Sequence, residues 1–260
     1  MFNYYVAHIG ITDCIADIRL NDVPIFMGEV DGYQSFSTPL NPCIDHNGIQ
    51  MLTVMMLPPF DATDIKEKTL SNEGSIRVEV SLFDVVDGML QGGGTVVSSY
   101  IEGGALLSAL KIDNKPFEAR IDYPVKRWSD CMRLDDGRDL KPAVLTFYNR
   151  IGKMLKNGQY GMYESMVLKR EREIVYSLGL DEKEIAKRQQ MLEDAISNGF
   201  EFVDIQGDEQ LLYFAGGRAL SLRTVEKKPA LRFYNKETGG FLGVDIMIGI
   251  KNGSSTFSII

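Results

Sequence analysis

The chain has 260 residues, of which 44% are apolar and 25% charged, and it carries a formal net charge of −8 at pH 7. These are ordinary values for a globular protein, so they exclude a disordered or low-complexity chain. A nonspecific nucleic-acid binder needs a cationic surface. The excess of 36 acidic over 28 basic side chains therefore argues against nucleic acid as a partner.

The N-terminal segment and the cysteines favour a cytoplasmic protein. Residues 1–8 contain neither a basic stretch nor a long apolar stretch, so we expect no secretory signal. No segment reaches the ~18 apolar residues of a membrane span, so we expect no membrane association. The three cysteines, Cys14, Cys43 and Cys131, are odd in number and widely spaced. This pattern favours reduced thiols over a disulfide framework.

Short apolar segments separated by turn residues make up the first half of the chain. The clearest is Ile76 to Leu82, in which apolar and polar residues alternate strictly, as in a half-buried strand. Prolines such as Pro39, Pro42 and Pro58 interrupt the loops between segments. Many short strands joined by turns predict an antiparallel β-sandwich. The expected strands cover residues 4–9, 15–20, 23–27, 49–57, 76–82, 95–101 and 117–123.

Helical spacing appears after residue 140. Apolar side chains recur every three or four residues from Val144 to Leu155, and Asn157-Gly158 ends the run. Two further helices are expected over residues 160–178 and 181–198. Three helices followed by strands predict an α+β domain in which a curved antiparallel sheet wraps over the helices like a cone. The expected strands cover residues 200–205, 211–214, 219–224, 231–234, 241–250 and 256–260.

These patterns predict two domains, a β-sandwich domain over residues 1–130 and an α+β domain over residues 131–260. Charge changes at the same place. Residues 1–130 hold 18 acidic and 9 basic side chains, a net charge of −9, whereas residues 131–260 hold 18 acidic and 19 basic side chains, a net charge of +1. The acidity of the chain is therefore concentrated in its first half.

The sequence contains no complete motif for catalysis, metal binding or cofactor binding. The chain has two histidines: we expect His8, inside an apolar strand, to be buried, and His46, before a turn, to face solvent. Cys14 or Cys43 with His46 is only a formal nucleophile–base pair, because no nucleophile elbow or protease signature surrounds it. Metal-ligand spacings and phosphate-binding glycine loops are also missing from the sequence. We therefore predict no catalytic residues, no metal and no cofactor.

One mixed charge cluster occurs on the second predicted helix. Residues 169–173 read Lys-Arg-Glu-Arg-Glu, and such a run is expected to form a solvated helix face. The alternative interpretation is a patch at which a partner docks.

The first half also resembles a known family of β domains. Residues 18–24, 32–36 and 47–54 resemble jelly-roll sandwiches of the sugar-binding type that are attached to bacterial glycosidases. Those domains have a strand ending in Asn-Gly, then Gly-Tyr-x-x-Phe, then a strand beginning Gly-Asn. In this chain Asn21-Asp22 replaces the first motif, and the last is inverted to Asn47-Gly48. The resemblance implies a sandwich fold and transfers no sugar-contacting residue.

A second resemblance concerns architecture. The segment Leu231 to Phe241, followed by two strands, is similar to the late hairpin of the cone-shaped fold of the nuclear transport factor superfamily. An acidic protein with such an α+β half and no catalytic set resembles the immunity proteins that neutralise bacterial secreted toxins. The resemblance implies a non-enzymatic protein whose partner is a toxin.

The combined sequence evidence predicts a protein that binds another protein. The alternatives are a carbohydrate-binding or accessory module, and a small-molecule hydrolase or isomerase that uses a cavity in the C-terminal half. For the protein interface, loop ends of the acidic half are the expected location. The candidate partner-binding residues there are Asp31, Asp45, Asp84 and Asp87.

Overall fold

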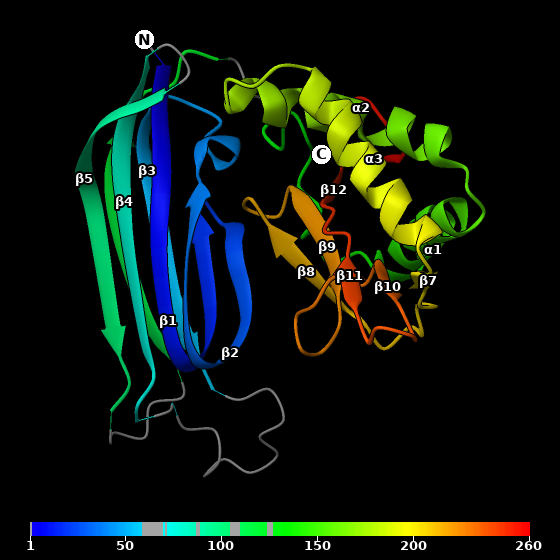
Figure 1. The fold of residues 1–260 in the computed structure, drawn as a ribbon, viewed down its shortest axis with the longest axis horizontal. Coiled ribbons are helices and arrows are strands. Elements are labelled where there is room, and N and C mark those ends of the chain that lie inside the picture. The colour runs from blue at the N-terminus through cyan, green and yellow to red at the C-terminus, as the bar shows by residue number, and fades with distance from the viewer. Residues whose placement is uncertain (1, 59–69, 71, 87–88, 105–109, 124–126) are drawn as a thin grey trace. The chain divides into compact units, whose positions relative to one another are not determined.

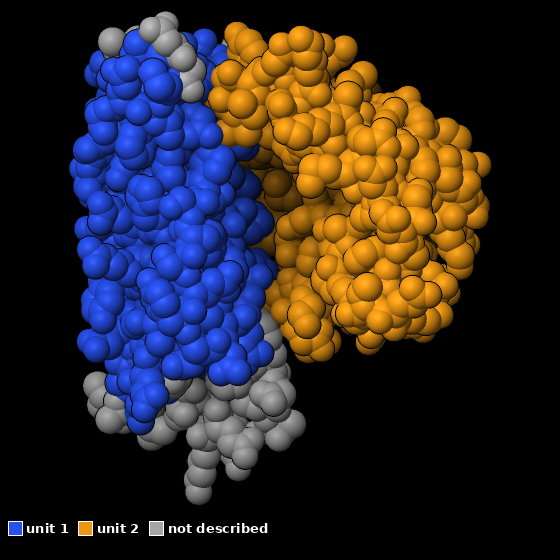
Figure 2. All heavy atoms as spheres, in the orientation of Figure 1, with its two compact units in different colours: residues 1–125 blue, residues 126–260 orange. Residues whose placement is uncertain are grey.

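A computed structural model describes residues 2–58, 70, 72–86, 89–104, 110–123 and 127–260. The chain divides into two compact units, residues 1–125 and residues 126–260, which we call the N-terminal unit and the C-terminal unit (Figure 2). Each unit is described separately below. Both antiparallel strands and helices are present, so the predicted mixed α+β class is confirmed.

The unit boundary lies earlier than the expected position between residues 130 and 131. Trp128, Cys131 and Leu134 are all buried, and the backbone of Leu134 donates a hydrogen bond to the carbonyl of Gly217. The segment around the expected boundary therefore belongs to the C-terminal unit. Whether each unit folds by itself stays a prediction.

The N-terminal unit consists of long antiparallel strands (Figure 1). The two strands expected at 4–9 and 15–20 are one continuous strand of 19 residues. All six strands belong to one hydrogen-bonded sheet in the order β5-β4-β1-β3-β6, with β2 paired to β1. The elements are β1 (Phe2–Leu20), β2 (Val23–Pro39), the 3₁₀ turn η1 (Asn41–Cys43), β3 (Gly48–Leu57), β4 (Ser75–Val86), β5 (Met89–Glu102) and β6 (Lys111–Ala119).

A bend in the β1–β2 hairpin curls this sheet. The first part of β1, residues 2–12, pairs with β4, whereas residues 15–20 pair with β3. Between these parts the register to β2 shifts, Asp13 and Gly32 have positive φ angles of 41° and 74°, and Asp13 Oδ1 accepts a hydrogen bond from the Gly32 N–H at 2.6 Å. Such a bulge turns a strand sharply. The result is one curled, half-barrel sheet where the sequence predicted a sandwich of separate sheets.

The concave side of this sheet holds one apolar core. The alternation predicted for residues 76–82 ends at Val80, because the register to β5 shifts there and Ser81 is buried while Leu82 is only half-buried. Up to that point it is confirmed, since Ile76, Val78 and Val80 are fully buried. They pack in the same cluster as Ile18 and Leu52 from the second part of the sheet. Burial of apolar side chains on the core face is the main favourable term that holds such a sheet together. Strand β5 contributes little to it, because residues 89–96 are exposed.

Three helices open the C-terminal unit, as predicted. They are α1 (Lys141–Lys156), α2 (Tyr160–Ser177) and α3 (Lys183–Ser197). The helical spacing correctly identified the buried stripe of α1, which consists of Val144, Tyr148, Ile151 and Leu155. This stripe packs with α2 and the strands into a second apolar cluster.

The strands of the C-terminal unit are shorter than expected and form two small antiparallel sheets. One has the order β11-β10-β7 and the other β13-β12-β9-β8. The strand expected at 241–250 is interrupted between Gly243 and Ile248. In this gap the Ile246 carbonyl accepts a hydrogen bond from the Tyr148 hydroxyl. The single cone-like sheet is therefore not observed. The strands are β7 (Glu201–Phe202), β8 (Gln210–Phe214), β9 (Ala219–Arg223), β10 (Arg232–Tyr234), β11 (Phe241–Gly243), β12 (Ile248–Ile250) and β13 (Phe257–Ile259).

Candidate functional site

The four candidate aspartates do not form a common site. Asp84 pairs with Asn3 at the start of β1, whereas Asp31 is exposed beside the bend. About 11 residues of β1 separate these positions, on the order of 35 Å of strand. Asp45 is engaged locally, because its carboxylate lies 2.6 Å from Nδ1 of His46 and its side chain is only 10% exposed. Asp87 lies outside the described residues.

An exposed apolar face on strands β3 and β6 is a stronger candidate for an interface. Ile49 of β3 is 63% exposed and Ile112 of β6 is 52% exposed, and Met51 between them in the sequence is also exposed. Side chains on one face of an antiparallel pair contact their cross-strand partners. Met51 lies opposite Pro116, and Met55 lies opposite Ile112. We call this surface the β3–β6 face; it consists of Ile49, Met51, Thr53, Met55, Ile112, Asn114, Pro116 and Glu118.

Charged side chains border the β3–β6 face on the neighbouring strand β1. Asp17 pairs with Met55 and Arg19 with Thr53 in the sheet register. Arg19 donates two hydrogen bonds to the carboxylate of Asp17, at 2.9 and 2.7 Å, and a third to Asp22 at 2.7 Å. This bidentate geometry fixes the guanidinium. Two carboxylates around one guanidinium leave the border with a net negative charge.

The sequence contained a signal for this face. Residues 49–57 are apolar at most positions, and the alternate residues Leu52, Val54 and Met56 fill the core. Ile49, Met51, Thr53 and Met55 lie on the opposite face. A strand that is apolar on both faces is expected to be covered on both, but the sequence could not show which face the fold leaves open.

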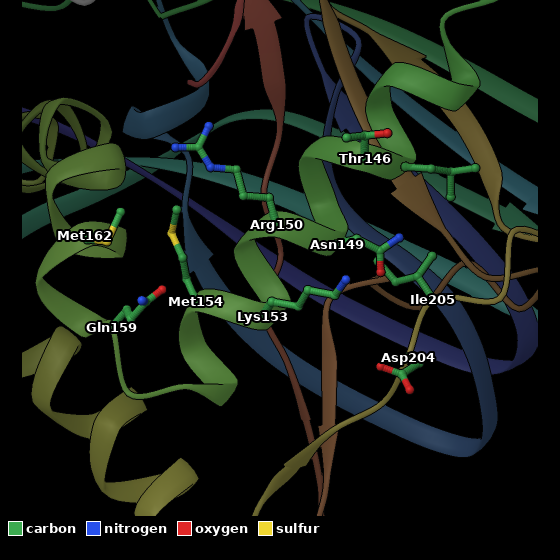
Figure 3. Close-up of a pocket in the computed structure, with 10 residues that line it drawn as sticks. Thr146, Asn149, Arg150, Lys153, Met154, Gln159, Met162, Asp204 and Ile205 are labelled. Carbon is green, nitrogen blue, oxygen red and sulfur yellow. The ribbon is translucent and has the colours of Figure 1, made fainter.

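A shallow groove on α1 is a further candidate for a binding site (Figure 3). It has a volume of about 900 Å³. Asn149, Arg150 and Lys153 of α1 border it, and Asp204 and Ile205 follow β7. Figure 3 shows these side chains leaving their elements in different directions. The lining combines these polar side chains with apolar ones such as Leu145 and Met162.

The two histidines and the thiol of Cys14 lie in separate local surroundings. The expectation that His8 is buried is wrong: the residue is exposed, and its Nδ1 lies 2.8 Å from the hydroxyl of Ser37. His46 faces solvent as expected. Burial, with help from the nearby Asp13 carboxylate, raises the pKa of Cys14 to about 11, which makes this thiol a poor nucleophile at neutral pH. The described residues contain no group of three or more metal-ligating side chains.

Comparisons with protein families, curated proteins and solved structures found no match for this chain. The two resemblances noted in the sequence therefore stay predictions. Among the described residues, no helix has both the length and the apolar composition needed to cross a membrane.

Proposed function

We propose that this protein acts by binding another protein without catalytic turnover, that it does so through the β3–β6 face, and that the partner is a secreted bacterial toxin which it neutralises. The exposure of Ile49, Met51 and Ile112 on adjoining strands carries this proposal. Apolar side chains exposed to water are less favourable than buried ones, and apolar patches mark interaction surfaces more often than scattered side chains do. On the β3–β6 face the polar pair Thr53–Asn114 separates Met51 from Ile112.

The residue types of the face support protein binding. Methionine side chains are flexible and polarisable, so they adapt to the shape of a partner. Met51 and Met55 are two such side chains on one strand. Binding energy in protein interfaces concentrates in a few central apolar anchors, with a polar rim around them. The Asp17–Arg19–Asp22 network has the position of such a rim.

Charge supports a basic partner. Residues 1–130 hold 18 acidic and 9 basic side chains, and complementary fields increase association rates more than they increase affinity. Asp31 and Asp84 lie too far apart to form one binding site, so in this proposal they contribute to the long-range field. The toxin-neutralising role rests on the resemblance to immunity proteins and on the lack of a catalytic pattern in the sequence.

The experiment is co-expression with a toxin encoded next to this gene. We expect the intact protein to restore growth and to bind the purified toxin, and Met51→Glu to weaken binding at least about 100-fold, since it places a charge at the centre of the face. The matched control is Leu90→Glu, which changes another exposed leucine-sized side chain on β5 and should alter binding less than about threefold. Equal effects of both substitutions would refute the β3–β6 face as the interface.

Two further measurements test the other parts of the proposal. The association rate should fall between tenfold and a thousandfold from about 20 to 500 mM salt, because the Debye length shrinks from roughly 20 Å to 4 Å. Substitution of His8 or His46 by Gln should leave protection within a few fold. A thousandfold loss in a folded His46→Gln variant would reveal an active site and contradict a purely binding role.

A further inference from the structure

The C-terminal unit contains a cleft between helices α2 and α3 that goes beyond the proposed protein interface. Its volume is about 580 Å³, within the ~300–1,000 Å³ typical of small-molecule sites. Val167 of α2, Leu192 of α3, and Leu242 and Val244 from β11 and the residue after it provide apolar walls. A molecule with an apolar body therefore fits the cleft.

A buried carboxylate lies in this apolar cleft. Glu171 was expected on a solvated helix face, but only 6% of the residue is exposed. Its oxygens lie 3.4 Å from Nη1 of Arg170 and 3.4 Å from Nε of Arg188. Charge-assisted hydrogen bonds are normally 2.7–2.9 Å long, so both arginines hold this carboxylate loosely.

Three polar atoms of the cleft have no hydrogen-bond partner among the described residues. They are two donors, Arg170 Nε and Gln189 Nε2, and one acceptor, Glu171 Oε2, which has the 3.4 Å ion pair with Arg188 Nε but no hydrogen bond. Leaving such a buried group without a partner costs about 1–3 kcal/mol. Because all three side chains line the same cleft, one ligand that offers two acceptors and one donor would satisfy them together.

The charges of the cleft favour an anion. Two guanidinium groups, Arg170 and Arg188, surround the single carboxylate of Glu171. Asp245 also lines the cleft, but its carboxylate is already 2.5 Å from Nη2 of Arg223, a buried arginine. The cluster therefore keeps one net positive charge, which a carboxylate group would balance.

Neighbouring groups keep part of this site in place and leave part of it movable. Nη2 of Arg170 donates to the carbonyl of Asp245 at 3.3 Å, which fixes the guanidinium against the wall of the cleft. The side chain of Arg188 is 45% exposed, so it can turn outward and uncover Glu171. Burial raises the pKa of Tyr163, so this residue lines the cleft as a neutral phenol.

We propose that the α2–α3 cleft binds an apolar molecule that carries a carboxylate next to an N–H donor, namely an apolar amino acid or the last residue of a peptide. The carboxylate binds Arg170 and Gln189, the N–H group donates to Glu171 Oε2, and the side chain packs against Val167 and Leu192. Free amino acid and peptide terminus share this chemistry, and the probes below separate them.

The test is isothermal titration of the full-length protein with four matched compounds. L-leucine and N-acetyl-L-leucine have both groups, L-leucinamide lacks the carboxylate, and 4-methylpentanoate lacks the N–H donor. We expect at least one of the first two to bind with a dissociation constant between about 10 µM and 1 mM, as is usual for ligands of this size, and both incomplete compounds to bind at least tenfold more weakly. Tighter binding of leucine indicates the free amino acid, whereas tighter binding of N-acetyl-leucine indicates a peptide terminus.

Three variants tie binding to the cleft. Arg170→Gln should weaken the better ligand at least tenfold, whereas the control Arg172→Gln changes an arginine of the same helix that is 56% exposed and should leave affinity within twofold. Glu171→Gln should weaken leucine but strengthen 4-methylpentanoate, since it removes the repulsion between two carboxylates. A misfolded variant would weaken both compounds, so this crossing pattern separates lost recognition from lost structure.

Three results would overturn the proposal. The first is the failure of both leucine and N-acetyl-leucine to bind at 10 mM. The second is binding of leucinamide as tight as that of the acids, and the third is equal affinity in the Arg170→Gln and Arg172→Gln variants. None of these results bears on the β3–β6 face, so the two proposals fail separately.

Discussion

The two units bury polar side chains in different ways. In the N-terminal unit the buried amides of Asn41 and Gln50 are hydrogen-bonded within the fold. Asn41, which is fully buried, accepts from Tyr5 N–H at 2.8 Å and donates to the Asn3 carbonyl at 2.9 Å. Gln50 donates to the carbonyls of His46 and Gly48 and accepts from Asn21.

The C-terminal unit, in contrast, contains buried polar atoms that lack a hydrogen-bond partner among the described residues. Among the described residues, every buried side-chain nitrogen or oxygen found without a hydrogen-bond partner belongs to this unit. Three of them line the α2–α3 cleft. Saturated polar groups stabilise a fold, whereas unsaturated ones keep hydrogen-bonding capacity for a ligand. The comparison therefore assigns a structural role to the buried amides of the N-terminal unit, and it motivates the recognition role that we propose for the cleft.

The largest expected effect is a loss of stability of the C-terminal unit on substitution of Gly152 in α1. It tests whether the two units have separate cores. A Cβ atom added there would lie 2.1 Å from Cζ of the buried Phe202 ring, so Gly152→Ala should destabilise this unit by about 3 kcal/mol. The measurement is urea unfolding followed by the fluorescence of Trp128, the single tryptophan of the chain, which is buried in the same unit.

Gly161→Ala is the control, since no atom lies within 4 Å of its added Cβ. It should be neutral or stabilising by up to about 1 kcal/mol, because alanine favours helix more than glycine does. Far-UV circular dichroism should still show an unshifted transition of the strand-rich N-terminal unit in Gly152→Ala. A joint shift of both transitions would contradict separate cores.

Asn41→Ala should produce the next largest effect, on the N-terminal unit. It leaves Tyr5 N–H and the Asn3 carbonyl without their partner, at a cost of about 2–3 kcal/mol. The circular dichroism midpoint in urea should fall while the Trp128 midpoint stays constant. Asn114→Ala removes an exposed amide from β6. It should change the free energy of unfolding of neither unit by more than about 0.5 kcal/mol.

Tyr148→Phe should have the smallest effect and a distinct pH dependence. The Tyr148 hydroxyl donates to the Ile246 carbonyl at 2.8 Å and accepts from Leu222 N–H at 3.1 Å, so its loss should cost about 1–2 kcal/mol near neutral pH. Burial raises the pKa of Tyr148 to about 12, against a model-peptide value of 10.0. A raised pKa contributes stability that is complete below pH 10 and disappears as pH rises towards 12.

The difference between the intact protein and Tyr148→Phe should therefore narrow from pH 10 to pH 12. Urea titrations at pH 8, 10 and 11.5, followed by Trp128 fluorescence, measure this change. A constant difference across that range would show that the hydroxyl titrates equally in the folded and unfolded states.

Local patterns were enough to predict the helices and the strand faces. The spacing from Val144 to Leu155 identified α1 and its buried stripe, and the alternation in residues 76–82 identified the core face of β4 up to Val80. These features depend on the period of the backbone, which is a property of neighbouring residues. The mixed α+β class follows from the same local signals.

Strand pairing and the burial of single side chains depend on long-range contacts, so only the tertiary structure decided them. The bend at Asp13 joins two expected strands into β1 and gives each half a different partner, because register depends on residues far away in the sequence. His8 became exposed, the candidate aspartates were separated, and Glu171 was buried between two arginines. Amino-acid type sets the free energy of burying a side chain, but packing against distant elements decides which side chains are buried. The sequence by itself therefore determined the three helices and the core face of β4 up to Val80, whereas the tertiary contacts determined the lengths and pairing of the strands and the positions of the candidate residues.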